Sequence, residues 1–188
     1  MYLTDEQIML LEQLTYLTDD VAAAAEVVLG PYDSVEENSG NSFNYTGADK
    51  WAAIIRQIKD DPDLYSLDIA NKDDSVPAMC FNDPDDPEHA VVVFKGTSGQ
   101  DEWVDNAIGL GTSDTERQKN ALEYIENLPY DNITVAGHSK GGNKAQYVTI
   151  LSDKIDRCIS MDGQGFSQEF LDKYYAEIEK KGNSIKNY

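Results

Sequence analysis

A serine pentapeptide offers the clearest nucleophilic chemistry in this chain. Gly137-His138-Ser139-Lys140-Gly141 has the Gly-x-Ser-x-Gly pattern, which puts a serine on a strained turn between a strand and a helix. Residues 133–136 are apolar enough for that strand, and a helical pattern begins directly after Gly142. We therefore predict that Ser139 is a nucleophile for acyl transfer rather than part of a plain glycine-rich turn.

The rest of the chain predicts an α/β fold, in which an open, mostly parallel sheet is flanked by helices. Residues 89–95 are apolar on both faces and should form a strand in the middle of the sheet. Residues 30–47 are rich in Gly, Pro, Ser and Asn, and are expected to form a loop. The predicted helices are 4–17, 51–58, 115–128, 142–152 and 167–180, and the predicted strands are 76–81, 89–95, 133–136, 157–161 and 184–188. Ligands of such sheets bind beyond the carboxyl ends of the strands, where Ser139 should lie.

Bulk properties exclude several classes of function. The 188 residues are expected to form one domain, 1–188. A net charge of −20 without any basic run argues against a nucleic-acid partner. Acidic residues interrupt the N-terminal segment, so no signal peptide is predicted, and no apolar run reaches the ~20 residues of a transmembrane helix. A soluble protein is expected, either cytoplasmic or exported without a classical signal.

The cysteines suggest neither a disulfide nor a metal centre. Cys80 and Cys158 lie far apart in apolar, strand-like runs, and the chain has only two histidines. We interpret both cysteines as buried free thiols. No metal and no cofactor is expected.

Three segments together resemble a known family. Phe94-Lys95-Gly96-Thr97, then residues 102–106, and the pentapeptide continued through Asn143 are similar to class 3 lipases, most closely their bacterial Mbeg1-like branch. The resemblance runs from the first helix to about Phe166. It implies an α/β-hydrolase fold and hydrolysis of a lipid or other acyl ester through an acyl-enzyme at Ser139. It also implies an oxyanion hole formed by the backbone N–H groups of Thr97 and Lys140.

Other residues near the predicted site have less specific roles. Asp162 follows the strand after the elbow, and is predicted either as a catalytic acid or substrate contact, or as a turn-stabilising residue. The His138 ring should pack away from the nucleophile, and His89 should lie at the opposite end of the sheet. The Lys140 side chain is expected to be solvated.

The segment 103–110 combines a short apolar stripe with acidic residues. Trp103 and Asp105 are expected to pack against and orient the oxyanion loop. The whole segment is interpreted as a lid or acyl-binding surface, or as ordinary core.

A hydrolase triad of this fold runs Ser, then Asp or Glu, then His, and no histidine follows Ser139. The chain thus looks like a hydrolase cut before its Asp and His, completed by a further segment or domain. It could instead borrow those residues from another chain, or be a non-catalytic binding module. The first interpretation is favoured, because a fragment keeps an elbow and an oxyanion strand passively. The 188 residues alone are expected to be inactive.

Overall fold

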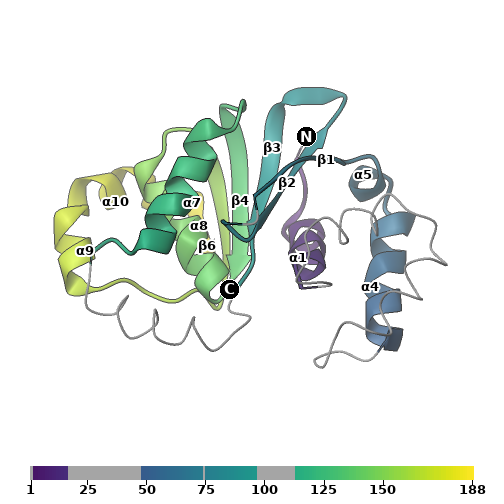
Figure 1. Cartoon of the computed structure of the whole chain (residues 1–188), viewed down its shortest axis with the longest axis horizontal. Helices are drawn as coiled ribbons and strands as arrows, with labels where there is room; N and C mark the ends of the chain where they lie inside the picture. Colours follow the sequence, from purple (N-terminus) through teal and green to yellow (C-terminus); the bar gives the residue numbers. More distant parts are fainter. Residues whose placement is uncertain (1, 17–47, 74, 97–112) are drawn as a thin grey trace.

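A mixed six-stranded sheet lies between two layers of helices (Figure 1). The computed structural model describes residues 2–16, 48–73, 75–96 and 113–188. The strands are β1 (Asp68–Asp73), β2 (Ala78–Asp83), β3 (Asp86–Phe94), β4 (Asn132–His138), β5 (Ile155–Met161) and β6 (Ile185–Asn187). The helices are α1 (Asp5–Leu14), α4 (Ala48–Asp60), α5 (Pro62–Tyr65), α7 (Glu116–Asn127), α8 (Lys140–Leu151), α9 (Gln168–Lys173) and α10 (Tyr175–Lys181), with a 3-10 turn at Gly182–Ser184.

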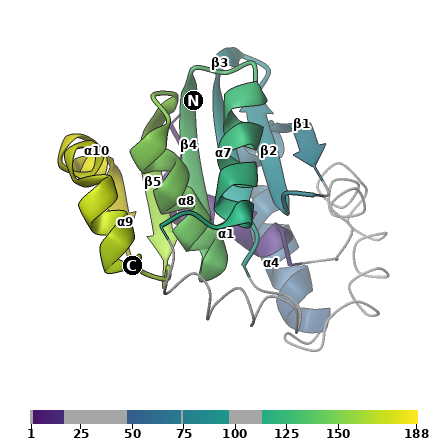
Figure 2. The ribbon, with the colours of Figure 1, turned by 60° about the vertical axis from the view of Figure 1, so that its left-hand side comes forward.

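The strands follow one another across the sheet in sequence order. β1, β2 and β3 are antiparallel neighbours, whereas β3, β4, β5 and β6 are joined by parallel pairings. The predicted parallel sheet is therefore confirmed for β3 to β6, and two antiparallel strands extend it at the β1 edge. Figure 2 shows α7 and α8 in front of the strands, with α1 and α4 behind them.

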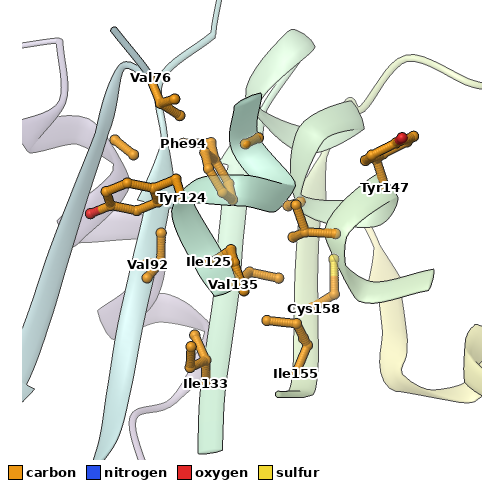
Figure 3. Packing of buried hydrophobic residues seen from close by; sticks show 14 of the residues in the cluster. Val76, Val92, Phe94, Tyr124, Ile125, Ile133, Val135, Tyr147, Ile155 and Cys158 are labelled. Atoms are coloured by element: carbon orange, nitrogen blue, oxygen red, sulfur yellow. The ribbon is translucent and has the colours of Figure 1, made fainter. Parts of the chain in front are cut away.

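Each face of the sheet has its own apolar core. Val92, Phe94 and Val135 point into the cluster under α7 and α8, which Figure 3 shows from close by. Val91 and Val93 belong to the cluster under α1, on the opposite face. β3 is thus covered on both sides, which confirms the interior position predicted from its apolar run.

Local signals in the sequence set the ends of two helices. The Thr4 hydroxyl accepts the Gln7 backbone N–H, and the Gln7 side chain accepts the Thr4 N–H in return. Thr115 and Gln118 make the same reciprocal pair at the start of α7. Such capping boxes satisfy backbone donors that have no acceptor within the helix. The first of these boxes starts α1 within the helix predicted over 4–17.

The structure differs from the predicted elements in three places. The edge strand β1 was not predicted, because Ile69 is the only β-branched residue in Asp68–Asp73 and pairing with β2 overrides weak propensity. The helix predicted over 167–180 is interrupted at Tyr174, whose backbone has φ −110° and ψ 27°. Strand β3 begins at Asp86, three residues earlier than predicted. The loop predicted over 30–47 lies outside the described residues.

Both cysteines are buried and free, as predicted. Burial raises the pKa of the Cys80 and Cys158 thiols to about 12. Neither is therefore a thiolate near neutral pH.

Candidate functional site

Ser139 lies on the turn that joins β4 to α8, where the backbone is strained. Its φ of 55° and ψ of −117° are unusual for a residue with a side chain, and such conformations cost about 1–3 kcal/mol. The side chain is partly exposed. The predicted strand-turn-helix unit is therefore present, with its serine at the carboxyl end of an interior strand.

Two glycines of the pentapeptide lie where no side chain would fit. A Cβ atom on Gly137 would lie 2.3 Å from the carbonyl carbon of Gly141. A Cβ atom on Gly141 would lie 2.0 Å from the carbonyl oxygen of Phe94, at the end of β3. Both obstacles are backbone atoms, so the turn keeps its shape only with glycine at these positions.

Backbone hydrogen bonds fix the turn on both sides of the serine. The Ser139 N–H donates to the Met161 carbonyl at 2.9 Å, which ties the turn to the end of β5. The Ser139 carbonyl accepts the Asn143 N–H at 3.1 Å and the Gln164 N–H at 3.3 Å. The serine backbone is thus held by β5, by α8 and by the loop after β5.

Asn143 extends this support through its side chain. Its Nδ2 donates to the Gln164 carbonyl at 3.0 Å, and its Oδ1 accepts the Gln118 side-chain N–H at 2.7 Å. The first turn of α8 therefore connects the loop after β5 to the start of α7. Neither Asn143 nor Gln118 was predicted to support the elbow, although an amide side chain directly after the glycines was a signal for such a link.

Lys140 is the first residue of α8, and its side chain is only 8% exposed. The prediction that the Lys140 side chain is solvated is wrong. Helix α8 packs against β3, β4, β5 and α7, so its first turn is covered. The Lys140 backbone N–H belongs to the N-terminal end of the helix, where amide groups point outward along the axis. This end of a helix favours negative charge.

The end of β3 lies beside the elbow. Phe94 pairs with Gly137 in the parallel register. A Cβ atom on Gly96 would lie 2.7 Å from the His138 carbonyl oxygen. Gly96, the residue before Thr97, is thus in contact with the turn that carries Ser139. Thr97 itself lies outside the described residues, as do Trp103, Asp105 and the predicted lid segment 103–110.

Asp162 follows β5 directly and is exposed. Met161 pairs with His138, which brings the Asp162 position to the edge of the sheet next to the elbow. Its φ is 45°, in the left-handed region, and its N–H donates to the Tyr188 carbonyl at 2.9 Å. This backbone geometry is that of a turn residue, and a catalytic role for Asp162 stays a prediction.

Neither histidine has a described contact with Ser139. The Nδ1 atom of His89 lies 2.8 Å from Asp86 Oδ1. His89 pairs with Asn132 at the amino end of β4, the end remote from Ser139. The Nδ1 atom of exposed His138 lies 3.3 Å from the hydroxyl of Tyr16.

Glu12 is buried in the apolar face of α1. It hydrogen-bonds with Tyr16, the residue whose hydroxyl contacts His138. Burial raises the pKa of its carboxyl to about 7, while hydrogen bonds with Tyr16 and Gln13 act in the opposite direction. Among the described residues, none forms a hydrogen bond with its Oε1 atom. Burial of Glu12 was not predicted, because a glutamate within an amphipathic helix ordinarily faces solvent.

One known protein family matches most of this chain. The profile of the Mbeg1-like family matches residues 66–186, which include the elbow, β3 and β5. The chain belongs to the Mbeg1-like family. The match confirms the resemblance noted in the sequence. No protein of curated function matches the chain.

Two solved lipase structures are similar to this Mbeg1-like chain. The crystal structure of M37 lipase superposes with a TM-score of 0.52 at 13% identity, over 100% of this chain and 67% of the lipase chain. A fungal lipase in complex with an inhibitor gives a TM-score of 0.41 at 15% identity, over 93% of this chain and 69% of that chain. At such low identity the first likeness supports the α/β-hydrolase-like fold.

In the described part of the chain, no group of three or more His, Cys, Asp or Glu residues is arranged to hold a metal ion. None of the helices in that part combines the length and the apolar character that crossing a bilayer requires.

Proposed function

We propose that this Mbeg1-like protein is a lipase-type serine hydrolase, acting on carboxylic esters through an acyl-enzyme at Ser139. The observation that carries the proposal is the strained backbone of Ser139 at the end of β4, with α8 beginning at the next residue. Strain of this kind persists only where surrounding structure enforces it, and it is concentrated at functional sites. The family match and the name of M37 lipase support the same class of reaction.

In the proposed reaction, the Ser139 hydroxyl oxygen attacks the ester carbonyl carbon as a base takes its proton. The tetrahedral intermediate then expels the alcohol and leaves the acyl group on the serine. Negative charge on the former carbonyl oxygen requires nearby N–H donors. We propose the backbone N–H groups of Lys140 and Thr97 for this role, the first at the start of α8 and the second directly after Gly96.

The substrate class we propose is a lipid or another acyl ester. Asp162 is proposed as an acid or substrate contact at the same edge of the sheet, because it follows the strand paired with β4. The rival function is a binding module without catalysis, which would have no need for a reactive Ser139.

Intact-mass spectrometry after long incubation with p-nitrophenyl butyrate tests the proposal. We expect one butyryl group per chain, located on Ser139 by peptide mapping, and none on Ser139→Ala. Hydrolysis of the adduct also needs a base, so the adduct should accumulate. Ser113→Ala, at a partly buried serine outside the elbow, is the matched control and should be acylated normally. A wild-type chain without any adduct on Ser139, even with imidazole added as the base, would exclude the hydrolase and leave the binding module.

The oxyanion donors can be tested separately by the rate of acylation. Thr97→Ala keeps the backbone N–H, so its rate should stay within a few-fold of wild type. Thr97→Pro removes that donor and should lower the rate by about 10²–10³. Circular dichroism must show that the proline variant is folded. An equal rate in a folded Thr97→Pro protein would place the donor elsewhere.

A further inference from the structure

Tyr16 follows α1 and lies far from the elbow in sequence, yet its hydroxyl contacts both sides of the site. The hydroxyl oxygen accepts the backbone N–H of Gly96 at 3.0 Å. The same oxygen lies 3.3 Å from His138 Nδ1. One side chain thus connects the end of β3 with the residue that precedes Ser139.

The contact with Gly96 is close as well as polar. A Cβ atom on Gly96 would lie 2.3 Å from the Tyr16 hydroxyl oxygen and 2.7 Å from the His138 carbonyl oxygen. Gly96 is buried. The strand end is therefore enclosed between the tyrosine hydroxyl and the backbone of the elbow, and a larger residue would push them apart.

The tyrosine ring is itself held in place. It meets the His138 ring edge to face, with centroids 6.3 Å apart. The Lys95 ammonium lies 5.9 Å from the Tyr16 ring centroid. The Glu12 carboxyl, one turn earlier in the chain, shares a hydrogen bond with the Tyr16 side chain. These contacts fix the hydroxyl relative to both α1 and the elbow.

From this geometry we infer that Tyr16 is a positioning residue, which sets the spacing between the Gly96 strand end and the Ser139 elbow. The inference rests on the proposed function. Gly96 directly precedes Thr97, and His138 is two residues before Lys140, so Tyr16 contacts both segments that carry the proposed oxyanion donors. Because catalysis depends steeply on the placement of such donors, fixing two segments with one hydroxyl affects the rate without any contact with substrate.

Tyr16→Phe tests the inference, because it removes only the hydroxyl. Acylation of Ser139 by p-nitrophenyl butyrate should slow about tenfold at saturating ester, while the half-saturating ester concentration stays unchanged. Amide hydrogen exchange, followed by NMR, should be faster at Gly96 in the variant, because its N–H has lost its acceptor. Tyr65→Phe, at a 52% exposed tyrosine on α5, is the control and should leave both measurements unchanged.

A second variant guards against loss of folding. His138→Phe keeps a ring beside Tyr16 on an exposed position and removes the Nδ1 atom. It should slow acylation by a smaller factor, about threefold, while Gly96 remains protected from exchange.

The outcomes separate the two proposals. Wild-type acylation and Gly96 exchange in a folded Tyr16→Phe protein would overturn the positioning role alone. A change in the half-saturating ester concentration alone would also overturn the positioning role, because it would indicate that Tyr16 contributes to ester binding. A wild-type chain that is never acylated at Ser139, even with imidazole added as the base, would contradict the proposed function and the positioning role together.

Discussion

The backbone N–H of Ser139 donates to the carbonyl of Met161 at 2.9 Å, and this bond joins the elbow to the end of the neighbouring strand. The bond stabilises a conformation that a serine does not adopt by preference. Glycines pack closely against the same turn, so a side chain added there should disturb it.

Replacing Gly141 with alanine should destabilise the protein and disturb the elbow. The new Cβ atom would lie 2.0 Å from the Phe94 carbonyl oxygen, and neither backbone segment can yield without moving β3 or α8. We expect a loss of about 1–3 kcal/mol, seen as a lower thermal midpoint. Gly165→Ala is the control, because no atom of the described residues lies within 4 Å of its added Cβ atom. Equal midpoints for the two variants would contradict this packing.

Glu12 should make the protein less stable as the pH rises. Its pKa is about 7 in the folded state against an ordinary value of 4.5, so the folded protein binds this proton more tightly than the unfolded chain. The associated stability is fully present below pH 4.5 and is lost as the pH rises through 7. A shift of this size corresponds to roughly 3 kcal/mol.

Glu12→Gln should remove that pH dependence, because glutamine does not titrate. Urea unfolding from pH 4 to pH 8 measures it, and the difference between variant and wild type should grow toward pH 8. Glu6→Gln, at an exposed position on the same helix, should retain the wild-type slope. Parallel slopes for wild type and Glu12→Gln would show that Glu12 titrates normally.

Asp5 should have the opposite pH dependence. Its carboxyl accepts hydrogen bonds from Lys186, Tyr188 and Arg157, which join the start of α1 to β5 and the end of the chain. Hydrogen bonds from Lys186 and then Tyr188 hold the pKa of Asp5 well below its usual range. The unfolded chain therefore binds this proton more readily, and the stabilisation is present above about pH 4 and lost as the pH falls below it.

Asp5→Asn should lower the free energy of unfolding at pH 7 by only about 1–2 kcal/mol, because two of the three partners, Lys186 and Tyr188, are exposed. The difference from wild type should shrink in acid, because the unfolded wild-type chain then binds the proton that the folded state binds only weakly. Asp156→Asn, at an exposed position on β5, is the matched control. A constant difference between pH 2 and pH 7 would be inconsistent with an ionised Asp5 in this role.

The sequence predicted the parts of this fold that local patterns determine. The apolar run 89–95 and the pentapeptide around Ser139 carried enough information for the interior strand and the elbow. Long-range relationships were not visible, because Tyr16 meets Gly96 only when α1 packs on the sheet. Burial of Lys140 likewise depends on how α8 packs against the sheet and α7. Edge strand β1 depends on backbone pairing with β2, which its own side chains do not signal.

In the 188-residue chain, Ser139 should react slowly with an acylating or phosphonylating reagent. Serine needs a neighbouring base to lose its proton in the transition state. The chain has two histidines: the Nδ1 of His89 lies 2.8 Å from Asp86 at the far end of β3, and the Nδ1 of His138 lies 3.3 Å from the Tyr16 hydroxyl. A fluorophosphonate probe should therefore label Ser139 slowly. The proposed oxyanion donors alone would give roughly 10³–10⁴ over the reaction in water, far below an intact triad. Added imidazole should raise the labelling rate of wild type and leave Ser139→Ala unlabelled, because a free base then takes the proton.

A longer chain that supplies an Asp followed by a His should react quickly without imidazole. Fast, stoichiometric labelling of the 188-residue chain itself would show that a base already reaches Ser139, either from a second copy of the chain or through a rearrangement of His138.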